Sequence, residues 1–206
     1  MAMPESAGSV VISAAVEGDV DEAVVRRLVA VAGGEIGFVY GKTGKAALRQ
    51  RIAGYNNAAR HSPWMVLVDL DHEADCPPPF RTAWLPDPAP RLCFRVAVRQ
   101  VEAWLMADVD TLAPFLRVAR SRVPTNPEAL DNAKLALVNV ARHSRRRDIR
   151  TDMVPREGAG RTVGPAYTSR LIEYAHWHWR PQVASLRAES LRRAMACVQR
   201  LVETAA

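Results

Sequence analysis

The chain has 206 residues, of which 49% are hydrophobic and 24% are charged, a composition typical of a globular protein with a substantial core. No apolar run approaches the ~20 residues of a membrane-spanning helix. No basic residue precedes the first apolar stretch, so we expect neither a membrane span nor a signal peptide. The three cysteines are widely separated, which indicates reduced thiols and a cytoplasmic location. With 28 Lys and Arg against 22 Asp and Glu, the net charge is +6, which is mildly basic.

Strand and helix patterns alternate over the first half of the chain. Val24, Val25, Leu28 and Val29 form a helical stripe that ends on two glycines suited to a C-cap. Strands separated by helices of this length favour βαβ crossovers, and therefore an α/β fold whose mostly parallel sheet has about four strands and flanking helices. We expect strands at 10–18, 35–40, 64–71 and 91–98, helices at 20–34 and 45–60, and a proline-rich loop between 72 and 90.

The second half of the chain is predicted to be helical. Asn126 and Pro127 are typical of an N-cap and a first helical position, and the segment 144–163, rich in Arg and Gly, is predicted to be a loop. We expect an α/β core over residues 1–110 and a helical, arginine-rich region over 111–206, packed together as one compact unit. The expected helices lie within 100–116, 126–143, 163–179 and 184–203.

Acidic side chains follow two of the predicted strands at the point where each strand ends. Glu17 follows the first strand, and Asp69 and Asp71 end the third. The carboxyl ends of parallel strands meet at the edge where ligands bind, and residues two apart on a strand share a face. These acids can therefore converge, with Asp21 beside them in the next helix. Such a cluster repels itself unless protons or a cation intervene, and oxygen-only ligands favour Mg²⁺ or Mn²⁺. The alternatives are that Asp19 or Asp21 caps the helix and that Asp69 binds a loop amide.

Four segments resemble the Toprim fold of topoisomerases, primases and the overcoming-lysogenisation-defect (OLD) nucleases, and in particular a family of small Toprim-like proteins. The resemblance covers roughly residues 10–140 and extends loosely into the tail. The segments are VEGDVDEAVVRRL (16–28), VLVDLD (66–71), RVAVRQVEAWLMAD (95–108) and NPEAL (126–130), the last followed by Lys134.

The resemblance implies metal-assisted cleavage of phosphodiester bonds with one or two Mg²⁺ or Mn²⁺ ions. In Toprim enzymes the first Glu acts in acid–base chemistry or binds metal and two Asp hold Mg²⁺, which implies these roles for Glu17, Asp69 and Asp71. The nuclease branch adds an acid four residues after the Glu, which matches Asp21, and a later Glu on a helix, for which Glu102 is the candidate. Glu102 has a structural alternative, because an acid in the first turn of a helix is favourable anyway. Proteins of this kind often lie beside an ATPase, so a separate ATPase partner is also implied.

Arginine is concentrated between residues 142 and 161. Seven arginines lie in this segment against three acids, a pattern typical either of a surface that binds phosphates or of a solvated basic face. We interpret it as part of a nucleic-acid-binding surface. The candidate contacts are Lys42, Lys45, Arg145, Arg146, Arg147 and Arg150.

Two other motifs resemble sites with different functions, but neither fits its pattern. The segment GFVYGKTGK (37–45) resembles a P-loop, but Gly37 lies one residue too late for the required spacing. The segment HWHW (176–179) contains two histidines that diverge on a helix, so an aromatic cluster packing the tail onto the core is favoured over a metal site. The sequence therefore predicts a Mg²⁺- or Mn²⁺-dependent nuclease acting on DNA or RNA. The main alternative is a non-catalytic or ATPase-partnered regulatory module, and a P-loop phosphotransferase is the third.

Overall fold

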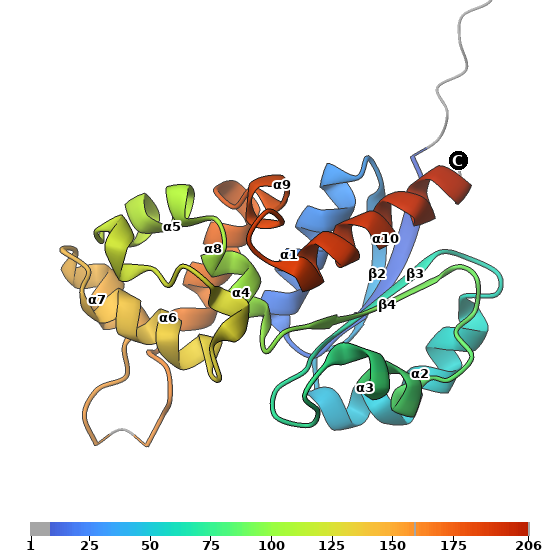
Figure 1. Ribbon diagram of the computed structural model, residues 1–206, viewed down its shortest axis with the longest axis horizontal. Helices are drawn as coiled ribbons and strands as arrows, with labels where there is room; N and C mark the ends of the chain where they lie inside the picture. The colour runs from blue at the N-terminus through green and yellow to red at the C-terminus, as the bar shows by residue number, and fades with distance from the viewer. Residues whose placement is uncertain (1–8, 159, 206) are drawn as a thin grey trace, which may run out of the picture.

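The computed structural model describes residues 9–158 and 160–205 (Figure 1). The strands are β1 (Val11–Val16), β2 (Glu35–Gly41), β3 (Trp64–Asp69) and β4 (Leu92–Ala97). The helices are α1 (Asp19–Val31), α2 (Lys45–Ala58), α3 (Pro77–Trp84), α4 (Val101–Met106), α5 (Val109–Leu116), α6 (Ala133–Arg142), α7 (Arg147–Met153), α8 (Tyr167–Trp177), α9 (Pro181–Ala184) and α10 (Glu189–Ala205), with 3₁₀ turns η1 (Arg120–Arg122) and η2 (Pro127–Ala129).

The strands form a four-stranded sheet in the order β2-β1-β3-β4, and every neighbouring pair is parallel. β1 and β3 are the central strands, and β3 is buried along almost its whole length. A strand covered on both faces needs apolar side chains at nearly every position, which explains its continuous run of apolar residues. The predicted α/β class and the largely parallel sheet of about four strands are therefore confirmed.

Helices cover both faces of the sheet (Figure 1). α1 and α10 pack on one face, where Ile12, Met65 and Cys93 belong to the larger hydrophobic core. α2 and α3 pack on the other face, where Val66 and Phe94 belong to a second, smaller core. The alternation of side chains along each strand thus divides its apolar residues between the two layers.

The helices from α4 to α9 extend the molecule beyond one end of the sheet (Figure 1). The larger core continues into this region through residues such as Trp104, Leu137, Ile149 and Leu171. α8 packs against α1, and α10 returns to lie along β4. The sheet and the helical region therefore share one core. No helix in the described residues is long and apolar enough to cross a membrane.

Two predicted loops contain helices. α3 forms inside the proline-rich segment because its prolines lie in the first turn, where a missing N–H removes no helical hydrogen bond, while Phe80 and Trp84 pack into the smaller core. α7 forms within 144–163 because Ile149 and Met153, four residues apart, bury one face against the larger core.

The predicted start of the helix within 126–143 is also wrong. Pro127 begins the short turn η2, and α6 begins only at Ala133. The cap is Asn132, whose side chain accepts a hydrogen bond from the Leu135 amide at 2.8 Å. The capping side chain of Asn132, six residues after Asn126, thus decides where the helix starts.

Ser190 joins the end of β4 to α4 and α10. Its Oγ accepts hydrogen bonds from the Val98 amide at 3.3 Å and from Trp104 Nε1 at 2.7 Å. The same hydroxyl donates to Glu128, which also accepts the amides of Glu189 at 2.8 Å and Ser190 at 3.0 Å. These bonds satisfy the first N–H groups of α10 and hold it against the sheet.

We expect the substitution Ser190→Ala to lower the free energy of unfolding by about 1–3 kcal/mol, because the buried Trp104 N–H and the Val98 amide lose their acceptor. Urea denaturation of the two proteins measures this difference. The control is Ser185→Ala, whose exposed hydroxyl donates to the Gln182 carbonyl and whose loss should change stability by no more than about 0.5 kcal/mol. Equal effects of the two substitutions would contradict the role given to Ser190.

Candidate metal centre at the carboxyl edge of the sheet

A cavity of about 280 Å³ opens where β1 and β3 end. The first turn of α1, the start of α4, and side chains from α6 and α8 form its walls. Its lining includes Asp19, Asp21, Asp69, Glu102, Lys134 and Tyr167. Three of the five predicted metal ligands therefore meet in one cavity, which we call the carboxylate cavity.

Glu17 follows β1 directly and stands beside the carboxylate cavity. Its Oε1 accepts a hydrogen bond from the Asp69 backbone amide at 2.8 Å, which joins the ends of two neighbouring strands. Burial raises the pKa of the Glu17 carboxyl above its ordinary value, although the Asp69 amide and the charge of Lys45 act in the opposite direction. A carboxyl with a raised pKa holds a proton more readily than an ordinary glutamate, as a group that moves protons must.

Asp69 is the last residue of β3. Its Oδ1 accepts a hydrogen bond from the amide of Val101, the first residue of α4, at 2.9 Å. Burial raises the pKa of Asp69 well above its ordinary value, and the charges of Asp21, Glu102 and Glu17 raise it further. Asp69 therefore both binds a backbone amide, as its simpler alternative predicted, and belongs to the acidic cluster.

Asp21 is 7% exposed, and its Oδ1 has no hydrogen-bond partner among the described residues. Burial, followed by the charges of Glu17 and Glu102, raises its pKa to about 7. Gly18 is the N-cap of α1, and no side-chain hydrogen bond caps this helix. The alternative that Asp19 or Asp21 caps α1 is therefore wrong, and Asp21 is left as a buried acid that lacks a full set of partners.

Glu102 lies in the first turn of α4 and is only 2% exposed. The Tyr167 hydroxyl donates to its Oε1 at 3.2 Å, and the Lys134 ammonium lies 3.7 Å from the same oxygen. The charge of Glu102, followed by those of Asp69 and Asp21, raises the pKa of Lys134. A favourable charge at a helix start does not require burial, so Glu102 has a role inside the cavity beyond its place in the helix.

Tyr167 is the member of this cavity that the sequence did not indicate. It comes from α8, 65 residues after Glu102, and no local motif marks it. Lys134 had only its place in the resembling segments to distinguish it. Both depend on how the helical region folds back over the sheet edge, which periodicity within a segment does not reveal.

Asp71 does not line the carboxylate cavity. β3 ends at Asp69, and Asp71 has a left-handed backbone with φ of 48°. The extended spacing that predicted Asp69 and Asp71 on one face therefore does not persist, and that prediction is wrong. The Asp71 carboxylate instead accepts hydrogen bonds from Lys45 and, at 3.3 Å, from Gln100 Nε2.

The two lysines predicted to bind nucleic acid form ion pairs within the fold. Lys45 contacts Asp71 and, at 3.0 Å, Glu73. Lys42 pairs with Glu22 at 2.7 Å. Gly37 lies within β2, so the segment 37–45 forms the end of a strand and a turn into α2. It does not form the long glycine-rich loop that cradles phosphates in a P-loop.

The aromatic segment 176–179 is exposed at its first three residues and buried at its last. Trp179 is fully buried, and its Nε1 donates to the Trp104 carbonyl oxygen at 3.2 Å. His176 and His178 are exposed. Trp179 alone of the four thus packs deeply into the core.

The carboxylates fit a hard divalent cation by their chemistry, although they do not form a ready coordination sphere. No group of three or more His, Cys, Asp or Glu side chains in the described residues is arranged to hold a metal ion directly. Glu17 and Asp69 each use one oxygen on a backbone amide. Mg²⁺ is usually bound through one or two carboxylates and completes its octahedral shell with water and substrate phosphates. The unpartnered Asp21 Oδ1 and the acidic surroundings therefore suit Mg²⁺ or Mn²⁺.

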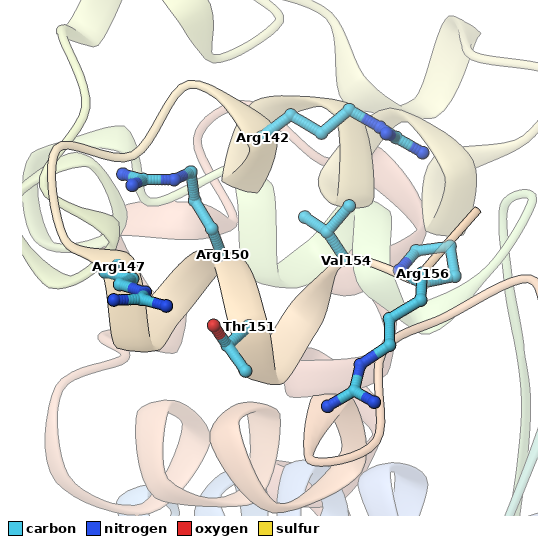
Figure 2. A pocket seen from close by; sticks show the side chains of 7 residues that line it. Arg142, Arg147, Arg150, Thr151, Val154 and Arg156 are labelled. Carbon is cyan, nitrogen blue, oxygen red and sulfur yellow. The ribbon is translucent and has the colours of Figure 1, made fainter.

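Four arginines surround a separate cavity of about 500 Å³ in the helical region (Figure 2). Arg142 ends α6, Arg147 and Arg150 lie in α7, and Arg156 follows that helix. In the described part of the chain none of the four forms an ion pair with an acid, whereas neighbouring Arg146 pairs with Asp148. We call this the arginine cavity, and its uncompensated positive charge suits phosphate groups.

The six predicted nucleic-acid contacts are thus not gathered in one place. Of the four arginines among them, Arg147 and Arg150 line the arginine cavity, while Arg145 and Arg146 line a neighbouring one beside α5. Arg156 of the arginine cavity and Thr162 of the carboxylate cavity both lie in the stretch of sequence between α7 and α8.

Comparison of the chain with models of protein families, with curated proteins and with solved structures gave no significant match. The resemblance to Toprim proteins therefore depends on the quoted segments, and membership of that family stays a prediction.

The raised pKa of Asp21 predicts a definite dependence of stability on pH. The folded protein retains this proton up to about pH 7, whereas the unfolded chain loses it near its ordinary pKa of 3.8. The contribution of Asp21 to stability is therefore present below about pH 4 and is lost as the pH rises to about 7, at up to about 1.4 kcal/mol per pH unit. In the presence of a chelator, Asp21→Asn should become increasingly more stable than the wild type over this range.

Urea denaturation of both proteins at a series of pH values measures this difference. The control is Asp87→Asn, at an exposed aspartate outside the cavity, for which the difference from wild type should stay nearly constant. If the difference in stability between Asp21→Asn and the wild type did not change with pH, the pKa of Asp21 would not be raised by folding, and the prediction would be contradicted.

Proposed function

We propose that this protein is a Mg²⁺- or Mn²⁺-dependent phosphodiesterase, and specifically a nuclease. The observation that supports this best is the convergence of Glu17, Asp21, Asp69 and Glu102 on one buried edge of the sheet. The resemblance of the same segments to Toprim nucleases points to the same chemistry. Fold class alone would not, because one fold supports many functions.

The electrostatics of the carboxylate cavity favour a bound cation. Asp21, Asp69 and Glu102 line a cavity whose basic lining residue is Lys134, and Glu17 lies beside it, where its charge acts on Asp21 and Asp69. Their mutual repulsion adds to burial in raising the pKa values of Asp21 and Asp69. A divalent ion would remove this penalty by replacing protons, and the Asp21 oxygen that lacks a partner is the first candidate to hold it.

The ion would be held by Asp21 and Asp69, with Glu102 and Glu17 completing its surroundings. When bound, it supplies polarisation of the phosphate and activation of water. Glu17, with its raised pKa, is the candidate for moving a proton at its free carboxylate oxygen. Lys134 is placed to bind phosphate oxygens, and the Tyr167 hydroxyl orients Glu102 by donating to its Oε1.

The substrate that best suits these features is a nucleic-acid strand. The arginine cavity offers four guanidinium groups without acidic partners among the described residues, and its Arg156 precedes by six residues Thr162, which lines the carboxylate cavity. Arginine pairs well with phosphate oxygens because its planar fork matches their geometry. A strand bound there would carry a phosphodiester toward the carboxylate cavity.

A second function, a non-catalytic regulatory module that binds nucleic acid or an ATPase partner, is favoured by a different observation. Asp71, which the resemblance makes a Mg²⁺ ligand, is neutralised by Lys45. The described residues also contain no preformed group of three metal-binding side chains. In such a module the acids would serve to hold the sheet edge together.

We expect the wild-type protein with Mn²⁺ to cleave single-stranded DNA or RNA, and Glu17→Gln and Asp69→Asn each to lower the rate about 100- to 1000-fold. Both substitutions keep the side-chain shape but remove a charge from the cavity. Cleavage of a fluorescent oligonucleotide measures the rate, and far-ultraviolet circular dichroism verifies the fold.

Asp87→Asn is the matched control, since it removes one exposed acid elsewhere and should leave the rate unchanged. Unchanged cleavage by the Glu17 and Asp69 variants would contradict the proposed site. A wild-type protein that neither cleaves nor gains thermal stability from Mn²⁺ would favour the regulatory module.

The arginine cavity gives a separate prediction about binding. We expect Arg147→Gln with Arg150→Gln to weaken oligonucleotide binding and to reduce the slope of log K against log salt by about 1.4, because about 0.7 counterions are released per single-strand phosphate contact. Fluorescence anisotropy in EDTA measures both quantities. The charge-matched control is Arg51→Gln with Arg60→Gln, two exposed arginines on or next to α2. An equal loss of slope in the control would mean that net charge, and not the arginine cavity, holds the strand.

A further inference from the structure

A further cavity, of about 340 Å³, lies at the β4 edge of the sheet between α3 and α10. In Figure 1 this edge runs between α10 above it and α3 below it. Pro77, Val96 and Val98 contribute an apolar wall, and Arg81 of α3 and Arg95 of β4 contribute a charged one. The proposed nuclease chemistry makes no use of this cavity.

Among the described residues no acid pairs with Arg81 or Arg95, and the side chains that hydrogen-bond to Arg95 are the thiols of Cys93 and Cys197. The Nε atoms of both arginines are buried, and neither Nε has a hydrogen-bond partner among the described residues. An unsatisfied buried donor is unfavourable, and more so when it is charged. Such groups in a native protein call for an explanation, and a bound ion is one of those they fit.

The two arginines also act on each other. Burial, followed by the charge of Arg95, lowers the pKa of Arg81, so the two positive groups are close together. Cys93 and Cys197 face Arg95 from inside the fold, and a hydrogen bond from Cys93 together with the charge of Arg95 lowers the pKa of Cys197 to about 6. One thiolate balances at most one of the two guanidinium charges, which leaves room for an anion.

The two glutamates of the cavity already have partners of their own. Glu128 accepts the amides of Glu189 and Ser190 at the start of α10. Glu189 forms ion pairs with Arg192 and Arg193. Both carboxylates are therefore bonded at the start of α10, and among the described residues neither forms an ion pair with Arg81 or Arg95.

We propose that this cavity binds a phosphate monoester through Arg81 and Arg95. The guanidinium groups present N–H donors in a fork that fits phosphate oxygens, and the positive charge that the thiolate leaves unbalanced attracts an anion. The apolar wall of Pro77, Val96 and Val98 accommodates the organic part of the ligand, and the volume lies within the range of small-molecule sites. The monoester is either that of a free nucleotide or the 5′-phosphate at the end of a nucleic-acid strand. This site does not depend on the proposed nuclease activity.

Isothermal titration calorimetry in EDTA tests the proposal, because the chelator removes any contribution from a metal in the carboxylate cavity. We expect AMP to bind and adenosine not to bind. If the ligand is the end of a strand, a 5′-phosphorylated oligothymidylate should bind more tightly than the same strand with a 5′-hydroxyl. If the ligand is a free nucleotide, AMP should bind more tightly than either strand. Arg81→Gln with Arg95→Gln should weaken binding of the phosphorylated probe at least about tenfold, equivalent to about 1.4 kcal/mol.

The charge-matched control Arg51→Gln with Arg60→Gln should keep its affinity for AMP. A measurement on the wild type does not depend on how the variants fold. Cys76 is exposed and lines the proposed site, so AMP should slow its alkylation, read by peptide mass spectrometry, whereas adenosine should not. The proposal is overturned if no phosphate-bearing probe binds, or if AMP binding survives in the Arg81 and Arg95 variant.

Discussion

The hydrogen bond from the Asp69 amide to the Glu17 carboxylate fixes the acidic edge on which the rest of the site depends. The Asp69 carboxylate repeats the arrangement by accepting the Val101 amide, so carboxylate-to-amide bonds connect β1 to β3 and β3 to α4. This connection sets the start of α4 and turns Glu102 into the same cavity. Each bond satisfies a backbone donor at an element end and partly offsets the burial of a charge. Asp21 has no such partner for its Oδ1, and burial together with the charges of Glu17 and Glu102 raises its pKa.

Much of this edge could be predicted because its cause is local. A buried strand that ends in an acid indicates the strand and the acid together, so Glu17 and Asp69 were predictable, and Asp21 followed from the strand-to-helix turn. The position of Asp71 was not predictable, because its backbone is left-handed and its carboxylate contacts Lys45 of α2 and Gln100 before α4, which are distant in sequence. The contributions of Lys134 and Tyr167 arise from the helical region, whose packing on the sheet is set by tertiary contacts that no window of sequence contains.

The basic residues show a second limit of local prediction, which is that counting charges does not reveal how they pair. Lys42, Lys45 and Arg146 belong to a basic composition, yet each is matched to an acid in the fold. Arg81 and Arg95 lie in unremarkable stretches of sequence, yet their buried Nε atoms are without partners among the described residues. What distinguishes a binding arginine from a structural one is therefore whether an acid lies within reach. Only the folded arrangement supplies that information.

A single short connection separates the carboxylate cavity from the phosphate site at the β4 edge. Val98 lines one cavity and Val101 lines the other. The segment between them is held on several sides, by the bond from the Val98 amide to Ser190, by the bond from the Val101 amide to Asp69, and by Arg99, which donates to the carbonyl oxygens of Asp71 and Ala74. A wall fixed in this way loses little freedom when a ligand arrives, so binding energy in either cavity is not consumed in ordering it. Since any coupling between two sites is reciprocal, a ligand that displaced this segment from one side would alter affinity on the other by the same factor.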